Sequence, residues 1–351
     1  TLDGISQYNT NDAAPSWTTN VVPTKDNYQA ASKFQISSAQ GLSTNATSGN
    51  CDNYITVRGF KFISSGAGGF GPNAIYTGNL IVEFNDITAS AGAAGGPGLL
   101  VGPGNSGPGC GGTGADNVTV RYNFIHDTFG ECLYIGASTP NPPGSGNAST
   151  GANYVIQGNR IEGCALRGGQ GEGIDVKDGH VNLQIIGNTI RSTLGNPGND
   201  GQGMAIESGS VIDGNFIEAP DHNCIAVFDG WNNTTGRSSI SIRNNICVNV
   251  NSGNGHNNGI ELFNIVASPW GAAKIQNNTI HSINGAYKCV TVDATWGAGT
   301  VAVQNNIFSA CGGGGLSAGA GDLATHDNNL FFGTGAASIS YSGTFTCANV
   351  S

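Results

Sequence analysis

Short runs of alternating apolar and polar residues recur along the whole chain, and many end in Asn, a variable residue and Ile or Leu. Examples are YVIQGNRI at 154–161 and LQIIGNTI at 183–190. Alternation with a period of two predicts a β-strand with one buried face. The motif recurs every 23 to 38 residues, and its Asn is expected at Asn85, Asn123, Asn159, Asn188, Asn215, Asn244, Asn278, Asn305 and Asn328.

A second alternating strand precedes each motif, as in CLYIG at 132–136 and GIDVKDG at 173–179. Each repeat is therefore predicted to be strand, turn, strand, tight turn at Asn, strand and loop. Asn tolerates the left-handed backbone conformation, and Asn side chains stacked ~4.8 Å apart in successive coils would hydrogen-bond as a ladder. The pattern predicts an all-β parallel β-helix solenoid of about nine to eleven coils, with residues 1–351 forming a single domain.

Two other repeat-like folds fit the pattern less well. An antiparallel sandwich would need two-residue hairpin turns such as Asn-Gly at the strand ends, and these are mostly absent. A leucine-rich repeat would need regularly spaced Leu, which the chain lacks.

Composition narrows the classes of partner. Only 10% of the residues are charged, 57 are Gly, and the net charge is −10 with 13 basic residues and no basic run. Nucleic acid is therefore not an expected partner, and a polyanion would be repelled unless a cation mediates the contact. No apolar stretch reaches the roughly 18 residues that a membrane span needs, so we expect no membrane-spanning segment.

Cysteines and glycosylation sequons together favour an oxidising, extracellular location. The chain has nine Cys residues, more than is typical of a cytosolic protein. Pairs spaced by about one coil are the disulfide candidates, with one Cys left over: Cys110 with Cys132, Cys224 with Cys247, and Cys289 with Cys311. Candidate glycosylation sites are Asn45, Asn117, Asn147, Asn232, Asn233 and Asn277.

The segments DNYITVRGFKF (52–62), NFIHDTFGECLYIG (123–136) and GEGIDVKDG (171–179), with the Asn motifs between them, resemble the pectate-lyase-like right-handed β-helix superfamily. The resemblance extends from about Thr1 to Leu330 and implies a right-handed solenoid. Members include polysaccharide lyases, hydrolases, epimerases and non-catalytic surface proteins, so the fold alone does not choose a function. Members usually begin with a helical cap, whereas TLDGISQYNT looks like part of the solenoid. An uncapped solenoid exposes strand edges, so either flanking segments are missing or a partner covers the ends through end-to-end or lateral protein contacts.

The strands before each Asn motif should form one long sheet whose outward residues carry charge and aromatic rings. In the superfamily this sheet is the usual substrate cleft. We predict Lys177 and Arg167 as catalytic residues of a lyase acting on uronate glycans, where a base removes the proton next to a carboxylate and Ca²⁺ neutralises that carboxylate. The predicted Ca²⁺ ligands are Asp175, Glu172 and Glu207, and the predicted substrate-binding residues are Tyr134, Phe228, Trp231, Phe263 and Trp270.

Several alternatives remain open at these positions. Glu207 and Lys177 could form an ordinary ion pair between neighbouring coils. Asp175, Glu207 and Glu261 could supply the carboxylate pair of a glycoside hydrolase. His126 next to Asp127 is expected to pack in a loop rather than to catalyse, and the aromatic rings, Trp296 among them, could stack on one another instead of on sugars. The alternative to a lyase is a non-catalytic structural, adhesive or glycan-binding extracellular solenoid.

Overall fold

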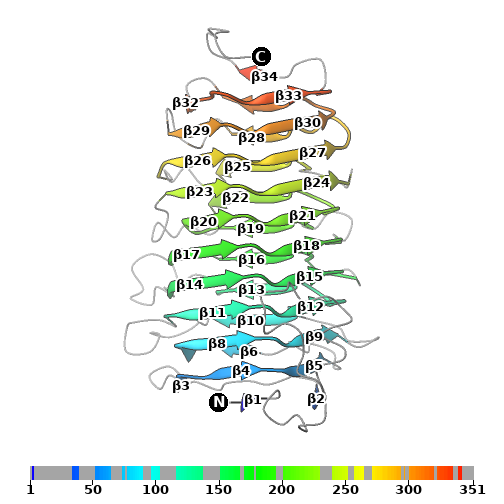
Figure 1. The fold of residues 1–351 in the computed structure, drawn as a ribbon, viewed down its shortest axis with the longest axis vertical. Coiled ribbons are helices and arrows are strands. Elements are labelled where there is room, and N and C mark those ends of the chain that lie inside the picture. Colours follow the sequence, from blue (N-terminus) through cyan, green and yellow to red (C-terminus); the bar gives the residue numbers. More distant parts are fainter. Residues whose placement is uncertain are drawn as a thin grey trace, which may run out of the picture.

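The protein is a right-handed parallel β-helix in this computed structural model, in which strands stack coil upon coil from β1 to β34 (Figure 1). The structure describes residues 2–3, 34–38, 52–64, 73–75, 77–89, 96–102, 116–136, 151–166, 170–177, 179–194, 201–229, 239–251, 257–264, 271–293, 296, 300–319, 322–334 and 339–341. Every regular element within these residues is a strand. The predicted all-β solenoid is therefore confirmed.

Three parallel sheets run the length of the molecule, and each coil contributes one strand to each sheet. Sheet A contains β1 (Leu2–Asp3), β4 (Thr56–Arg58), β8 (Leu80–Glu83), β11 (Val118–Arg121), β14 (Gly151–Gln157), β17 (His180–Ile186), β20 (Ser210–Asp213), β23 (Ile240–Arg243), β26 (Ala273–Gln276), β29 (Val301–Gln304) and β32 (Leu323–Thr325). Sheet B contains β2 (Phe34–Ser38), β5 (Phe60–Ser64), β9 (Asp86–Ala89), β12 (Phe124–His126), β15 (Arg160–Glu162), β18 (Thr189–Arg191), β21 (Phe216–Glu218), β24 (Ile246–Val250), β27 (Thr279–Ile283), β30 (Ile307–Cys311) and β33 (Leu330–Phe332).

Sheet C is formed by the strand that precedes each Asn motif. It contains β6 (Asn73–Ile75), β10 (Leu99–Gly102), β13 (Leu133–Ile135), β16 (Ile174–Val176), β19 (Met204–Ile206), β22 (Ile225–Asp229), β25 (Ile260–Asn264), β28 (Val290–Val292), β31 (Leu316–Ala318) and β34 (Ile339–Tyr341). A short extra pair joins β3 (Asp52–Asn53) and β7 (Thr77–Gly78). The described strands account for ten coils with all three sheets and part of an eleventh, as the repeat predicts.

One narrow apolar core fills the solenoid from Val57 to Ala318. Each strand contributes inward residues at alternate positions, so that Ile174 and Val176 of β16 are both fully buried. Each side chain of this kind stabilises the fold by roughly 1.5–3 kcal/mol relative to an exposed one. Because every coil stacks its Ile and Val on those of its neighbours, the core is continuous and needs no helix to cover it.

An asparagine ladder runs inside the turn between sheets A and B. Asn188, for example, donates from Nδ2 to the carbonyl of Ile156 at 2.9 Å and to Oδ1 of Asn215 at 3.0 Å. Its own Oδ1 accepts from the backbone N–H of Asn159 at 2.9 Å. The members are Asn85, Asn123, Asn159, Asn188, Asn215, Asn245, Asn278, Asn306 and Asn329.

Three predicted ladder positions were wrong by one residue. The predictions named Asn244, Asn305 and Asn328, but these residues precede the ladder Asn and adopt the left-handed conformation, with φ of 56°, 57° and 56°. In other coils Gly takes that place, as Gly187 does before Asn188. Where two Asn residues are adjacent, the first turns the backbone and the second points inward to bond, so the ladder Asn itself does not need a positive φ.

Three disulfides join neighbouring coils at the same corner of the solenoid. They are Cys132–Cys164, Cys224–Cys247 and Cys289–Cys311, with sequence separations of 32, 23 and 22 residues. Each links the start of a sheet C strand to the sheet B side of the following coil. The pairs of Cys224 and of Cys289 were predicted correctly.

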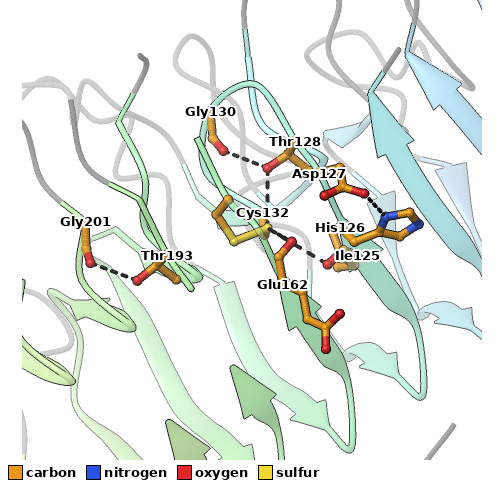
Figure 2. The surroundings of a disulfide bond; sticks show 10 residues. Ile125, His126, Asp127, Thr128, Gly130, Cys132, Glu162, Thr193 and Gly201 are labelled. Atoms are coloured by element: carbon orange, nitrogen blue, oxygen red, sulfur yellow. Dashed lines mark hydrogen bonds and ion pairs between the residues drawn. A yellow bond between two sulfur atoms is a disulfide. The ribbon is translucent and has the colours of Figure 1, made fainter. Parts of the chain in front are cut away.

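The predicted pair of Cys110 with Cys132 is wrong, because Cys132 bonds to Cys164. The segment between Cys132 and Cys164 is longer than the segments that the other two disulfides close, so a constant spacing of 22 or 23 residues misses the partner. Cys110 lies outside the described residues. Figure 2 shows the surroundings of this disulfide, where the Thr128 hydroxyl donates to the Gly130 carbonyl at 2.8 Å and lies 3.3 Å from the Cys132 sulfur.

Candidate functional site

The outward side chains of sheet C stack in two columns along the solenoid, as the sequence predicts. One column runs through Leu100, Tyr134, Asp175, Ala205, Ala226, Glu261 and Thr291. Two residues further along the strands, a second column runs through Lys177, Glu207, Phe228 and Phe263.

Several of these outward side chains are nonetheless covered. Tyr134 is 8% exposed, Asp175 0% and Glu261 5%. The described part of this face is therefore a mostly buried polar layer rather than an open row of charges.

Lys177 is held between two carboxylates. Its Nζ lies 2.9 Å from Asp175 Oδ2 and 3.3 Å from Glu207 Oε1, and 5.4 Å from the centre of the Tyr134 ring. Its side chain is only 13% exposed. Burial alone would lower the pKa of Lys177, but the charges of Asp175 and Glu207 outweigh burial and hold that pKa well above its usual value. The ion pair that the sequence offered as the alternative to a catalytic lysine is present.

Three carboxylates form an acid cluster, defined here as Glu131, Glu172 and Asp175. One oxygen from each lies within 4.8 Å of the others, and all three residues are buried. Burial, followed by the nearby Asp175 charge, raises the pKa of Glu131 to about 7. Burial, and then the charges of Asp175 and Glu131, raise the pKa of Glu172 well above its usual value. The positive charge near the acid cluster is therefore too small to keep the pKa values of Glu131 and Glu172 at their ordinary level.

The acid cluster differs from the predicted Ca²⁺ site in one member. Glu172 and Asp175 are in it, Glu207 instead contacts Lys177, and Glu131 takes the third place. The sequence contains the signal for Glu131, because GEC at 130–132 and GEG at 171–173 occupy the same place before two successive sheet C strands.

These two glutamates belong to a wider set, the strand-start row, defined as Glu131, Glu172, Gln202, Asn223 and Asn258, each two residues before a sheet C strand. The side-chain amides in this row complete backbone bonds of the next coil. Asn223 Oδ1 accepts from the N–H of Asn258 at 2.6 Å, and Asn258 Oδ1 accepts from the N–H of Lys288 at 2.9 Å. Asn223 also donates to Glu261 Oε2 at 2.7 Å. Glutamates occupy this row in two consecutive coils, and neutral amides occupy it in the three coils that follow.

His180 supports the backbone beside Lys177. Its Nδ1 lies 2.9 Å from the Lys177 carbonyl oxygen, which also accepts from the Ser208 hydroxyl at 2.8 Å. The His180 ring is fully buried and packs edge-on against Tyr154 at 4.9 Å. Burial lowers the pKa of His180 to about 4, so the imidazole is neutral near pH 7.

Two of the predicted substrate-binding rings form a pair. Phe228 and Phe263 stack with centroids 5.1 Å apart and an angle of 16° between the rings, and both are half-buried. Tyr134 lies against Lys177 instead, and Trp296 is fully buried in the core, so it cannot contact a glycan. The predicted residues Trp231, Trp270 and Arg167 lie outside the described residues.

His126 has a structural place on sheet B, away from sheet C. Its Nδ1 lies 2.7 Å from Asp127, and its Nε2 lies 2.9 Å from the buried Asp86, which also pairs with Lys61 at 3.0 Å. Its ring stacks on Phe124 at 4.1 Å. The expected packing role, with a hydrogen bond to Asp127, is therefore the one that the structure has.

Two of the predicted glycosylation residues can be placed. Asn117 is exposed and belongs to an outer row of side-chain amides, donating to Asn79 and accepting from Asn153, both at 3.0 Å. Asn277 is exposed at a left-handed turn position. Asn45, Asn147, Asn232 and Asn233 lie outside the described residues, and glycosylation at all six sites stays a prediction.

Comparison of the chain with protein-family models, with curated proteins and with solved structures finds no match. The geometry supports the parallel β-helix fold, and the pectate-lyase-like superfamily stays a resemblance carried by sequence segments. Among the described residues, no helix is long and apolar enough to span a membrane.

Proposed function

We propose that this protein is an extracellular glycan-binding solenoid that does not use Lys177 as a catalytic base. The observation that carries this proposal is the position of Lys177 between Asp175 and Glu207. A lysine base must lose its proton near neutral pH, whereas the pKa of Lys177 is shifted in the opposite direction. Lys177 is therefore assigned to stabilising the two buried carboxylates.

The Phe228–Phe263 pair supports glycan binding. The two rings stack on each other across neighbouring coils and form a half-buried apolar patch on sheet C, and the apolar face of a sugar ring can pack against such a patch. Disulfides that cross-link successive coils fit an oxidising extracellular location. Both features suit a rigid surface that binds a polymer along its length.

Affinity electrophoresis against a panel of neutral and uronate polysaccharides tests this proposal. At least one glycan should retard the wild type, and Phe228→Ala or Phe263→Ala should weaken that interaction about tenfold, or roughly 1.4 kcal/mol. Tyr122→Ala is the matched control, because Tyr122 stacks on Phe84 in a comparable pair, 5.4 Å apart at 20°, outside sheet C. Equal loss in all three variants, or no retardation of the wild type by any glycan, would contradict the proposal.

A Ca²⁺-assisted lyase is the second candidate, favoured by the acid cluster directly beside Lys177. A cation there would offset the charge of Asp175 and so lower the pKa of the lysine. Absorbance of unsaturated products from uronate polymers, with and without chelator, distinguishes the two candidates. Activity that needs Ca²⁺ and disappears in Lys177→Ala would replace the first proposal with the second.

A further inference from the structure

We propose that Glu131, Glu172 and Asp175 form a structural Ca²⁺ site that links two successive coils, independently of glycan binding. The site would be a property of the fold, and Ca²⁺ would act as a cross-link between β13 and β16.

The first observation is the place of the two glutamates in the strand-start row. Asn223 and Asn258 hold that position two and three coils beyond Glu172, and the Oδ1 of each accepts from a backbone N–H of the next coil. Asn223 also donates from its amide to Glu261, and an ionised carboxylate has no such donor, because it can only accept. Two acceptors side by side need a donor or a cation between them.

The second observation concerns the oxygen atoms themselves. Glu172 is 3% exposed, and its Oε2 has no hydrogen-bond partner among the described residues. An unbonded buried carboxylate oxygen costs several kcal/mol in a protein interior. One oxygen of Glu172, one of Glu131 and one of Asp175 lie within 4.8 Å of one another, a separation that oxygens around a single cation at 2.3–2.6 Å can have.

The third observation is the local charge. Among the described residues, Lys177 is the ammonium that pairs with Asp175, and it is shared with Glu207. With all groups ionised, Glu131, Glu172, Asp175 and Glu207 would leave a net charge of −3 in a buried volume. A divalent cation bound by Glu131, Glu172 and Asp175 would reduce that imbalance to −1.

The donor set selects the metal. All the side-chain donors are carboxylate oxygens, which suit Ca²⁺ and Mg²⁺ rather than Zn²⁺, whose sites use His and Cys. Ca²⁺ accepts six to eight ligands in flexible geometry, whereas Mg²⁺ requires near-ideal octahedral geometry and keeps several waters. The two long Glu side chains come from separate coils and are buried, which favours the flexible geometry of Ca²⁺ over Mg²⁺ with its several waters.

Calorimetric titration of the chelator-treated full chain with CaCl₂ tests this proposal, with MgCl₂ as the comparison. We expect one Ca²⁺ per chain, bound at least tenfold more tightly than Mg²⁺, and a higher thermal midpoint in Ca²⁺ than in chelator. Glu172→Gln and Glu131→Gln should each weaken Ca²⁺ binding at least tenfold and lose the thermal shift. If one of these two variants fails to fold, the other still tests the proposal.

Glu261→Gln is the matched control. Glu261 is a buried glutamate on the same sheet, it accepts from Asn223, and a glutamine there keeps that acceptor. It should bind Ca²⁺ as the wild type does. A wild type that binds no Ca²⁺ at millimolar concentration, or Glu172→Gln and Glu131→Gln variants that bind like wild type, would overturn the assignment. Loss of Ca²⁺ binding with glycan binding intact would leave the proposed function standing, so the two failures can be told apart.

Discussion

Replacing one residue of the asparagine ladder tests the account of what holds successive coils together. Asn188→Ala removes a side chain that is 1% exposed and joins three consecutive coils. The variant keeps the backbone and the apolar core unchanged. It therefore isolates the contribution of the ladder.

The magnitude follows from the groups that lose their partners. The Ile156 carbonyl loses the Nδ2 donor at 2.9 Å, and the backbone N–H of Asn159 loses the Oδ1 acceptor at 2.9 Å. Asn215 keeps a bond from the backbone N–H of residue 188 at 2.8 Å, and the Asn159 side chain keeps the Val120 carbonyl. Two buried backbone groups are thus left without partners, at about 1–3 kcal/mol each, so we expect a loss of roughly 2–6 kcal/mol.

Equilibrium unfolding in guanidinium chloride measures this loss, with unchanged m-values indicating that the same surface becomes exposed. Asn251→Ala is the control, because Asn251 is exposed and its side chain bonds only to Asp221 at 3.1 Å among the described residues. Its substitution should change the free energy of unfolding by less than about 0.5 kcal/mol. If Asn188→Ala costs no more than the control, the ladder does not stabilise the solenoid.

Three further predictions concern the disulfides, Lys177 and His180. Replacing Cys224 and Cys247 together by Ala should lower the free energy of unfolding by roughly 3–4 kcal/mol, because the closed loop spans 23 residues; an unchanged denaturation midpoint would contradict this. Lys177→Met should cost about 3–5 kcal/mol by leaving buried carboxylates without their cation, and adding Glu207→Gln should recover part of the loss in the same denaturation assay. His180 has a folded pKa of about 4 against 6.5 as an ordinary value, so the unfolded chain binds more protons between these pH values and stability falls as pH drops from 6.5 to 4. The loss is roughly 3 kcal/mol of unfolding free energy. When the free energy of unfolding is plotted against pH, the curves of wild type and His180→Gln should diverge between pH 6.5 and 4. Parallel curves would refute the assignment.

Much of the fold follows from local pattern in the sequence. Period-two alternation places Ile174 and Val176 inward and Asp175 outward, because successive side chains on a strand point to opposite faces. The Asn motif predicts where each coil turns. It could not decide between the members of an Asn-Asn pair such as Asn244 and Asn245, because the two residues are identical and only the backbone conformation separates them.

The candidate site depended on which residues of different coils become neighbours, and tertiary structure alone decided that. Glu131 and Glu172 are 41 positions apart in the sequence, yet β13 and β16 pair directly. Coil length varies because the loops vary, so constant spacing gives the right partner for Cys224 but the wrong one for Cys132. Burial of Lys177 likewise could not be predicted from its own strand, since exposure depends on what packs over a face, whereas alternation determines only to which face a side chain belongs.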